Sequence, residues 1–452
     1  MEGPRLWPVA LALSALIWII TTTDGRHVFV HEALSDAFDS QAEHFLHGDV
    51  DVADEAVRWE GIVINGHARM YFGPFPSFLR MPLNAIYPAG RGAWSRISGF
   101  LAAEIALFAF AGLLADALKI SALSSRGRMW LGSACLVGFL FGTPLLLLLG
   151  NLSIYNEAII WGFAWSIAGL LFAWRCRNAA GRALTLYLIA FSICSGACLL
   201  SRVTYGAPLV VIAAMLAFLL IREKKPRLLP ALLVPLGICL IFCLGLSYAR
   251  FGNFTGISSN HYVNPTHREF LRTHSVFSLW RVPYSFADYF SWQLPVFQNR
   301  APFIWAGRHA VDHPELYSIT ASETYLPVTW TASWLLLGGT LGMIALVRRS
   351  SADWFELGCG VAFFCEAIGI LSYFCLAQRY SMDLYPFLIF CFLIFLRYSK
   401  RLLPRIYPVL IGLVAVSITV NSMATISWLL DAEQNIQPET HEILNQLVGR
   451  SK

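Results

Sequence analysis

Charged side chains are scarce in this chain. Only 13% of its 452 residues are Asp, Glu, Lys or Arg, whereas hydrophobic residues make up 57% and the mean hydropathy is +0.58. A soluble domain normally carries about a quarter charged residues. This shortage therefore excludes a soluble globular protein and predicts a polytopic membrane protein. The net charge of +5 requires no nucleic-acid partner, because most basic residues lie in short connections between apolar segments.

The long polar segments contain no cysteine. All ten cysteines lie in apolar segments or in short basic connections, so no disulfide framework is expected. The sequence has neither an internal repeat nor a low-complexity linker, and we expect residues 1–452 to form one integral-membrane domain. His261, His267 and His274 lack the spacing of a helical zinc pair, so no metal centre is predicted from them.

Eleven apolar runs have roughly the length of a membrane-spanning helix, about 17 to 25 residues. They lie near residues 5–22, 95–117, 129–150, 153–174, 183–200, 206–221, 228–248, 326–347, 354–376, 384–397 and 406–428. We interpret the first run as a span and not as a cleaved signal peptide, because no small-residue cleavage site follows it. The predicted fold is thus an all-α polytopic membrane protein with about 11 transmembrane helices.

Basic residues are distributed unequally between the two ends of these runs. Arg5 and five of the connections hold 17 of the 33 lysines and arginines, whereas the short connections at the opposite ends hold two. The positive-inside rule then places the N-terminus in the cytoplasm. Two long loops, 23–94 and 249–325, are expected on the extracytoplasmic side, with the C-terminal tail.

The first long loop opens with SDAFDSQAEHFLHGD, which predicts a short helix on the membrane surface. Ser35 is a good N-cap, Asp36 and Asp39 fall in the favoured first turn, and Gly48 provides a stop. Phe38 and other apolar residues share one stripe of this helix. We expect its acids to face water or a cavity.

Two further patterns follow in the same loop. Asn65-Gly66 separates two short alternating runs, and this dipeptide predicts a tight β-hairpin. The segment GPFPSFLRMPL contains three prolines and cannot continue the hairpin. We expect it to run along the interface as one of the short interfacial segments and to place Arg80 at the depth of lipid headgroups.

Several charged residues interrupt or flank the apolar runs on the predicted extracytoplasmic side. They are Asp39, Glu157, Arg202, Arg379 and Asp383. A charge near the hydrocarbon costs about 2.5 to 3.5 kcal/mol unless it is paired or hydrated. One alternative is structural, in which Arg379 snorkels to the surface or pairs with Asp383. The other is catalytic, because arginines can hold a lipid phosphate while a carboxylate removes a proton from an acceptor.

A first span, a surface helix with an early aspartate, and the segment YFGPFPSFL at 71–79 together resemble the GT-C superfamily of integral-membrane glycosyltransferases. That superfamily includes the protein O-mannosyltransferases and the lipid A aminoarabinose transferases. The chain differs from it in lacking an adjacent Asp-Glu pair and the lysine of a Lys-Pro-Pro-Leu segment. Arg80 would substitute for that lysine.

The resemblance implies roles for ten residues. The catalytic carboxylates would be Asp39, or alternatively Asp36, together with Glu157; donor phosphate would be bound by Arg202, Arg379 and Arg80; and Tyr71, Pro74, Tyr380 and Asp383 would contact substrate. The implied reaction is inverting transfer from a polyprenyl-phosphate-linked sugar to a glycan, lipid or protein hydroxyl. It would take place outside the inner membrane of a bacterium. A divalent cation, Mg²⁺ or Mn²⁺, could assist, although no motif requires one.

Two alternative functions remain open at the level of sequence. A lipid-linked saccharide transporter or flippase needs charge within its spans, where this chain has only Glu104, Asp116 and Glu366. An O-antigen polymerase or ligase would instead use the second long loop. In that case its relevant residues would be Arg250, Arg272, His274 and Arg281.

Overall fold

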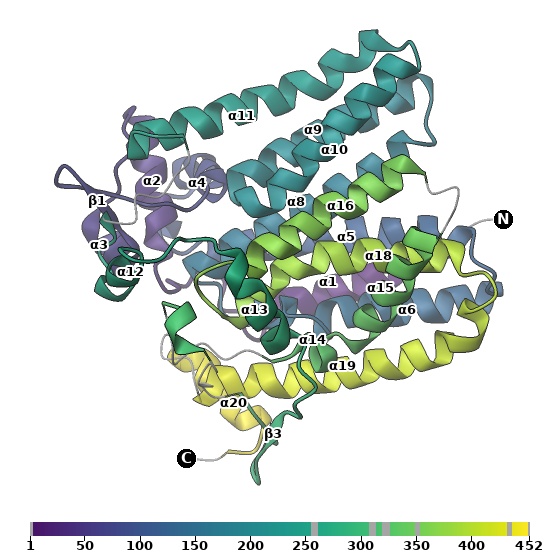
Figure 1. Ribbon diagram of the computed structural model, residues 1–452. Helices are drawn as coiled ribbons and strands as arrows, with labels where there is room; N and C mark the ends of the chain where they lie inside the picture. The colour runs from purple at the N-terminus through teal and green to yellow at the C-terminus, as the bar shows by residue number, and fades with distance from the viewer. Residues whose placement is uncertain are drawn as a thin grey trace.

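Long helices running in roughly the same direction form the body of the protein (Figure 1). The structure, a computed structural model, describes residues 3–254, 261–306, 313–318, 326–348, 353–431 and 436–450. Among these residues, eight helices are long and apolar enough to cross a membrane. They are α5 (Ser95–Lys119), α8 (Ile154–Cys176), α9 (Gly181–Ser201), α10 (Val203–Arg222), α11 (Leu229–Phe251, after η3 at Pro226–Leu228), α16 (Trp354–Leu371), α18 (Tyr385–Tyr398, after α17 at Gln378–Ser381 and η7 at Met382–Leu384) and α19 (Leu403–Asp431).

The other three predicted spans also fall on helices, but these are shorter. They are α1 (Trp7–Thr21), α6 (Ser125–Phe141) and α15 (Ser333–Arg348). The helical fold of the predicted segments is therefore confirmed, whereas the number of helices that cross the membrane stays a prediction.

Several predicted boundaries were wrong. The run at 129–150 is broken after α6, and a separate helix α7 (Leu145–Gly150) follows Pro144, because proline lacks the amide hydrogen that a continuous helix needs. The run at 326–347 is likewise divided into α14 (Val328–Thr331) and α15. Conversely, the expected polar break between α9 and α10 narrows to Arg202 alone, which is extended.

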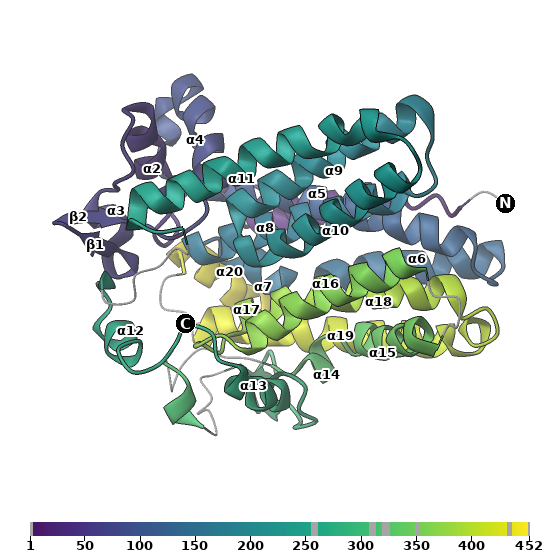
Figure 2. The same cartoon turned by 45° about the horizontal axis from the view of Figure 1, so that its top comes forward.

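Both long loops lie at one end of the helix bundle, opposite the N-terminus, and we call this the loop end (Figures 1 and 2). The first loop contains α2 (Asp36–Leu46), α3 (Asp54–Val57), η1 (Arg58–Glu60), β1 (Ile62–Ile64), β2 (His67–Arg69), α4 (Phe75–Ile86) and η2 (Pro88–Gly90). The second contains α12 (Pro265–Phe270), η5 (Leu279–Arg281), α13 (Val282–Tyr289), β3 (Val296–Phe297), β4 (Ile304–Trp305) and η6 (Pro314–Leu316). The C-terminal helix α20 (Pro438–Leu447) lies at the same end. The side of the membrane that this end faces remains a prediction.

The predicted hairpin is confirmed. Strands β1 and β2 are antiparallel, with Ile62 opposite Arg69 and Ile64 opposite His67. Both turn residues have positive φ, 54° at Asn65 and 84° at Gly66, as the tight two-residue turn requires.

The two long loops are joined to each other by backbone contacts. Ile62 forms a β-bridge with Tyr262, and the amide of Val263 donates to the carbonyl of Gly61 at 2.9 Å. The side chain of Tyr262 is buried among residues of both loops. The loops therefore form a single cap over the ends of the spans.

Helix α8 lies at the centre of the bundle, and α11 lies at its edge (Figure 1). Most residues of α8 are buried, whereas α11 buries only Leu232, Leu236, Leu246 and Arg250. The exposed face of α11 is strongly apolar, which suits contact with lipid acyl chains. Arg250 differs from the other buried residues of α11, which are leucines, because its side chain is charged.

Candidate active site

Three charged side chains meet in the interior at the loop end. The Arg80 nitrogen Nη2 donates to both carboxylate oxygens of Glu157, at 2.7 and 2.8 Å. Its Nε lies 3.5 Å from Oδ2 of Asp39. The side chains of Arg80 and Glu157 are fully buried and that of Asp39 is 2% exposed. Two of the predicted acids and one predicted arginine thus form a single buried cluster, which we call the acid–arginine triad.

Each member of the triad comes from a different helix. Asp39 and Glu157 lie in the first turns of α2 and α8, where the helix dipole stabilises a carboxylate. Arg80 lies in the middle of α4. Ser95, the first residue of α5, donates from its hydroxyl to Oε2 of Glu157 at 2.7 Å. The triad therefore depends on the packing of the first loop against two spans.

Asp39 has one carboxylate oxygen in a hydrogen bond and the other in an ion pair with Arg80. The Asn84 amide donates to Oδ1 at 2.7 Å, and the Trp94 indole in turn donates to Asn84 at 2.8 Å. Oδ2 receives no hydrogen bond from any described residue. Burial raises the pKa of Asp39 above its usual value, although the Arg80 charge and the Asn84 hydrogen bond oppose this effect. A carboxylate with a raised pKa is suited to accept a proton.

The structure also places three other residues of this loop. Arg80 is directed by α4 into the protein, where the two acids compensate its charge, and its depth relative to the lipid headgroups stays a prediction. The hydroxyl of Ser35 does not cap α2, since it donates to the carbonyl of Gly92 at 2.6 Å. Asp36, the alternative base, is half exposed and contacts His31 at 3.2 Å. It lies outside the triad.

A second cluster surrounds Asp383 at the start of the α18 span. Arg202 Nε lies 3.2 Å from Oδ1 of Asp383, and Thr204 donates to the same oxygen at 2.7 Å. The Arg202 guanidinium also lies over the ring of Tyr380, 5.6 Å from its centroid. The partner of Asp383 is thus Arg202 and not Arg379, which was the structural alternative considered above.

Arg379 lies between the second cluster and the first loop. Its guanidinium stacks on the rings of Tyr155, at 4.3 Å, and Tyr380, at 5.1 Å. Tyr155 belongs to the same helical turn as Glu157 of the triad. The two clusters are therefore neighbours, connected through the first turn of α8.

Glu60 is a candidate residue that sequence reasoning missed. It is 5% exposed and accepts hydrogen bonds from the hydroxyls of Tyr71, at 2.6 Å, and Tyr155, at 2.7 Å. Burial, followed by the nearby Glu60 charge, raises the pKa of Tyr71 well above its usual value. Tyr71, predicted to contact substrate, is thus held by a carboxylate of its own loop. The only signal in the sequence was an acid beside a short aromatic segment.

Close packing brings the first loop against the end of α9. A Cβ added at Gly73 would lie 2.3 Å from the backbone carbonyl oxygens of both Leu200 and Ser201, a distance that no side chain tolerates. Pro74 follows as the N-cap residue of α4. Glycine at position 73 thus allows the segment leading into α4 to approach the residues just before Arg202.

Arg250 is a buried cation at the loop end of α11. It is 4% exposed, and its Nη1 donates to the carbonyl of Phe72 at 3.0 Å. Its Nε and Nη2 have no hydrogen-bond acceptor among the described residues. The guanidinium lies 6.0 Å from the ring centroid of Phe45 in α2. A buried guanidinium with two unused donors beside the lipid-facing α11 offers a place for an anion.

The remaining second-loop candidates have structural contacts or face solvent. Arg281 is 2% exposed and donates to four backbone carbonyls. Arg272 and His274 are exposed. The described residues contain no group of three or more His, Cys, Asp or Glu side chains that could hold a metal ion.

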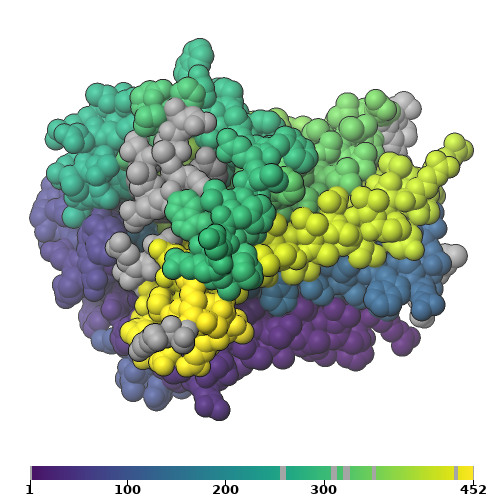
Figure 3. All heavy atoms as spheres, turned by 90° about the horizontal axis from the view of Figure 1, so that it is seen from below, coloured from purple at the N-terminus to yellow at the C-terminus, as the bar shows by residue number. Residues whose placement is uncertain are grey.

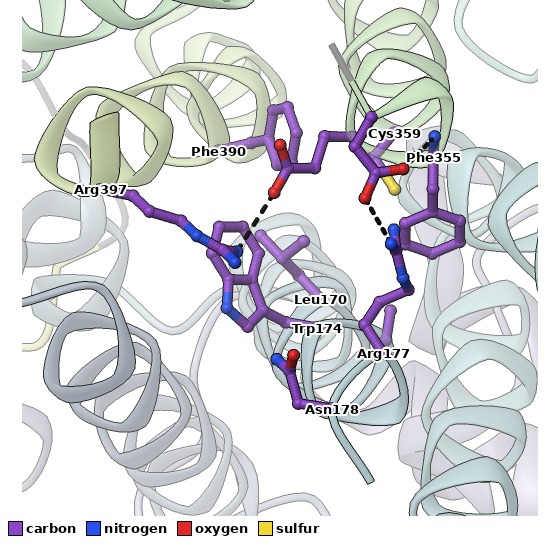
Figure 4. Close-up of a pocket in the computed structure, with 11 residues that line it drawn as sticks. Leu170, Trp174, Arg177, Asn178, Phe355, Cys359, Phe390 and Arg397 are labelled. Atoms are coloured by element: carbon purple, nitrogen blue, oxygen red, sulfur yellow. Dashed lines mark hydrogen bonds and ion pairs between the residues drawn. The ribbon is translucent and has the colours of Figure 1, made fainter. Parts of the chain in front are cut away.

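A small cavity of about 50 Å³, open to solvent, lies at the opposite end of the bundle between α8, α16 and α18 (Figure 4). Its two arginines already have acidic partners. Arg397 contacts Glu356 at 3.1 Å, and Arg177 is paired with Asp353. The cavity is therefore close to neutral and is separate from both clusters at the loop end.

Almost the whole chain is similar in fold to solved structures of another protein. No protein-family model matches the sequence, and no curated protein matches it. The chain is similar to ArnT from Cupriavidus metallidurans in two crystal structures. The one bound to undecaprenyl phosphate has 12% identity and a TM-score of 0.48, and the apo structure has 13% identity and a TM-score of 0.39. In both cases the match covers 98% of this chain and 78% of the ArnT chain.

Proposed function

We propose that the protein is an integral-membrane glycosyltransferase. In this proposal it transfers a sugar from a polyprenyl-phosphate-linked donor to an acceptor hydroxyl at the extracytoplasmic face. Ionisable side chains inside a membrane protein are costly and generally mark functional sites. Here they gather at the loop end in two neighbouring clusters and in Arg250.

Asp39 is the proposed general base. As the acceptor oxygen attacks the anomeric carbon, Oδ2 of Asp39 takes the hydroxyl proton. The bond from that carbon to the phosphate oxygen breaks, and its electron pair stays on the oxygen of the departing polyprenyl phosphate. Because the acceptor attacks from the face opposite the leaving group, the configuration inverts. Arg80 and Asn84 keep the carboxylate in place, and Glu157 holds Arg80. We therefore assign Arg80 and Glu157 to positioning and not to direct contact with the donor.

Arg250 is the proposed first ligand of the donor phosphate. Its two unused donors suit phosphate oxygens, and charge-assisted hydrogen bonds of this kind stabilise the charge that develops on the leaving group. Arg202 and Arg379 remain proposed ligands on the neighbouring side. Access for the lipid chain is provided by the apolar outer face of α11, beside which Arg250 lies.

The observation that carries this proposal is the presence of a buried carboxylate and a buried, incompletely bonded guanidinium at the loop end. Asp39 is held by Arg80 and Asn84, and two nitrogens of Arg250 lack an acceptor among the described residues. A reaction that moves a proton to a base and negative charge to a phosphate needs both kinds of group.

Binding of polyprenyl monophosphate, without any sugar, tests the donor part of the proposal. The full-length protein in nanodiscs is titrated with this lipid, and its dissociation constant is measured by native mass spectrometry. Arg250→Gln should weaken binding about tenfold or more, because charge-assisted hydrogen bonds are lost. Arg250→Lys should retain part of the affinity.

The matched control is Arg272→Gln, which removes an exposed arginine of the second loop. Its affinity should equal that of the native protein. Equal affinities for native protein and Arg250→Gln would overturn the proposed role of Arg250. No binding by the native protein would overturn the donor class itself.

A further inference from the structure

An unusually apolar surface is exposed on the second loop. Six side chains form it, and their exposed fractions are 82% at Trp280, 74% at Trp292, 73% at Leu279, 68% at Phe297, 67% at Leu294 and 53% at Phe286. We call this set the aromatic surface. None of its members is charged, and so many large apolar side chains exposed in one loop mark a contact with another phase or another molecule.

The aromatic surface is firmly attached to the bundle. Arg281 follows Trp280 and is 2% exposed. Its guanidinium donates to the carbonyls of Leu316 at 2.7 Å, Ser275 at 2.9 Å and Ser372 at 3.2 Å. Ser372 directly follows α16. These bonds hold Leu279 and Trp280, the part of the aromatic surface next to Arg281, beside the end of that helix.

The β3–β4 hairpin packs against the side of a candidate span. Ile304 and Ala306 share a core with Val420 and Ala424 of α19. The amide of Ala306 also donates to the hydroxyl of Ser427 in the same helix, at 3.1 Å. Figure 3 shows green segments of the second loop lying against the yellow C-terminal helices. The hairpin thus lies next to α19 and not above it.

Strand β3 faces away from α19. Its two residues, Val296 and Phe297, are both exposed. Because lipid surrounds a membrane-spanning helix wherever protein does not cover it, the environment of β3 at this height is lipid or the headgroup layer.

The aromatic surface also continues the exposed apolar row of α16. Leu357, Val361 and Phe364 are 41%, 54% and 46% exposed along that helix. Beyond its end, Phe277 packs on Tyr373 at 5.5 Å between ring centroids. The surface therefore adjoins two candidate spans, α16 and α19. A bilayer reaches both at once, whereas a partner protein would have to cover both.

We propose that the aromatic surface inserts into the lipid leaflet at the loop end and anchors the second loop in it. Tryptophan and phenylalanine favour this boundary, where apolar rings meet acyl chains. The anchor sets the height of the segment after α16 through the Arg281–Ser372 bond. The same segment carries Arg379 of the candidate site. This inference does not depend on the proposed function.

Fluorescence quenching in nanodiscs tests the inference with the full-length protein. Native protein and the double variant Trp280→Phe/Trp292→Phe are placed in phosphatidylcholine with or without bromine atoms near the top of the acyl chains. The difference in emission between native protein and variant reports the two tryptophans alone. In brominated lipid this difference should lose most of its intensity, whereas aqueous iodide should leave it unchanged.

Two single variants calibrate the measurement. Trp130→Phe reports an exposed tryptophan on α6, and Trp334→Phe reports one that is fully buried. The first should be quenched by brominated lipid, and the second by neither reagent. Quenching of Trp280 and Trp292 by iodide alone would overturn the inference, because the surface would face water. Protection from both reagents would overturn it in favour of a contact between two copies of the chain.

Discussion

Arg80 and Glu157 form a fully buried ion pair in which one guanidinium nitrogen contacts both carboxylate oxygens, at 2.7 and 2.8 Å. The two residues come from the first loop and from the central helix α8. Their pairing fixes the loop to the bundle at the position where Asp39 lies. Removing one partner would leave an uncompensated charge in the interior.

We first predict that Arg80→Met destabilises the protein by about 3–5 kcal/mol, the usual cost of breaking a buried pair. Thermal unfolding in detergent measures the change. Arg80→Met/Glu157→Gln should recover part of the loss, because the bare carboxylate is removed. The control is Arg91→Met, whose pair with Glu43 is about half exposed and should contribute at most about 1 kcal/mol. Equal effects of Arg80→Met and Arg91→Met would contradict the prediction.

A second prediction distinguishes the two candidate bases. Asp39→Asn should lower kcat about 10²- to 10⁴-fold, the usual contribution of a general base, and should leave binding of polyprenyl monophosphate intact. Asp36→Asn should remain close to native, because Asp36 is half exposed and outside the triad. Transfer from a panel of polyprenyl-phosphate hexoses and pentoses measures both. The reverse pattern would move the base to Asp36.

The raised pKa of Asp39 leads to a third prediction, on pH and stability. Since the pKa is higher in the folded state than in the unfolded state, native stability falls as pH rises from the unfolded pKa to the folded pKa. The variant Asp39→Asn has no titrating group at this position, so this contribution to the pH dependence of its stability is absent. The variant should therefore gain stability relative to native protein as pH rises through that window. Unfolding curves at several pH values measure both stabilities, and a fall in the stability of the variant relative to native protein as pH rises would refute the assignment.

The same shift predicts the acidic limb of the activity profile. Asp39 accepts a proton only when ionised, so kcat/KM should fall as pH decreases through its raised pKa. The midpoint of this limb should lie above the usual aspartate value. A limb at the usual value would assign the base to a solvent-exposed acid.

A fourth prediction concerns Glu60. Tyr155→Phe or Tyr71→Phe should each cost about 1.5–3 kcal/mol, the contribution of a hydrogen bond to a charged group. Because Glu60 is buried, the double variant should cost more than the sum of the two, and a chemical unfolding series measures this coupling. Tyr87→Phe changes a half-exposed tyrosine and should have no effect. If the free-energy costs of the two single variants simply add, Glu60 must accept a hydrogen bond from another group in the double variant.

Gly73→Ala provides the fifth prediction. The added methyl would overlap the carbonyls at the end of α9, so α4 must shift at a cost of about 1–3 kcal/mol. Gly237→Ala is the matched control, because nothing lies within 4 Å of a Cβ added there. Thermal unfolding and polyprenyl phosphate binding should both weaken in the first variant and stay unchanged in the second.

Local patterns in the sequence were sufficient for the elements that depend on local physics. The hairpin follows from Asn65-Gly66, and the apolar runs fall on helices. The approach of Asp39 to Glu157 was also predictable, since topology brings both acids to one end of the bundle. The burial of Arg80 against both acids was not, because an arginine on the protein surface and one in the interior look alike until α4 is placed.

Glu60 and Arg250 show what the sequence alone could not indicate. Both become buried only when the two long loops pack on each other and on the spans. That packing depends on contacts between residues far apart in the chain, and no local motif reports it. The weak likeness to a longer transferase does not supply these contacts either, since it carries no assignment of individual residues.

The β-bridge between Ile62 and Tyr262 joins the two loops edge to edge. The cap therefore depends on contact between segments that lie on either side of the spans α5 to α11 in the chain. In a chimeric protein that receives only one loop from a homologue, the β-bridge and the burial of Tyr262 would be lost. A graft should keep the thermal stability of the native protein only when both loops are transplanted as a pair.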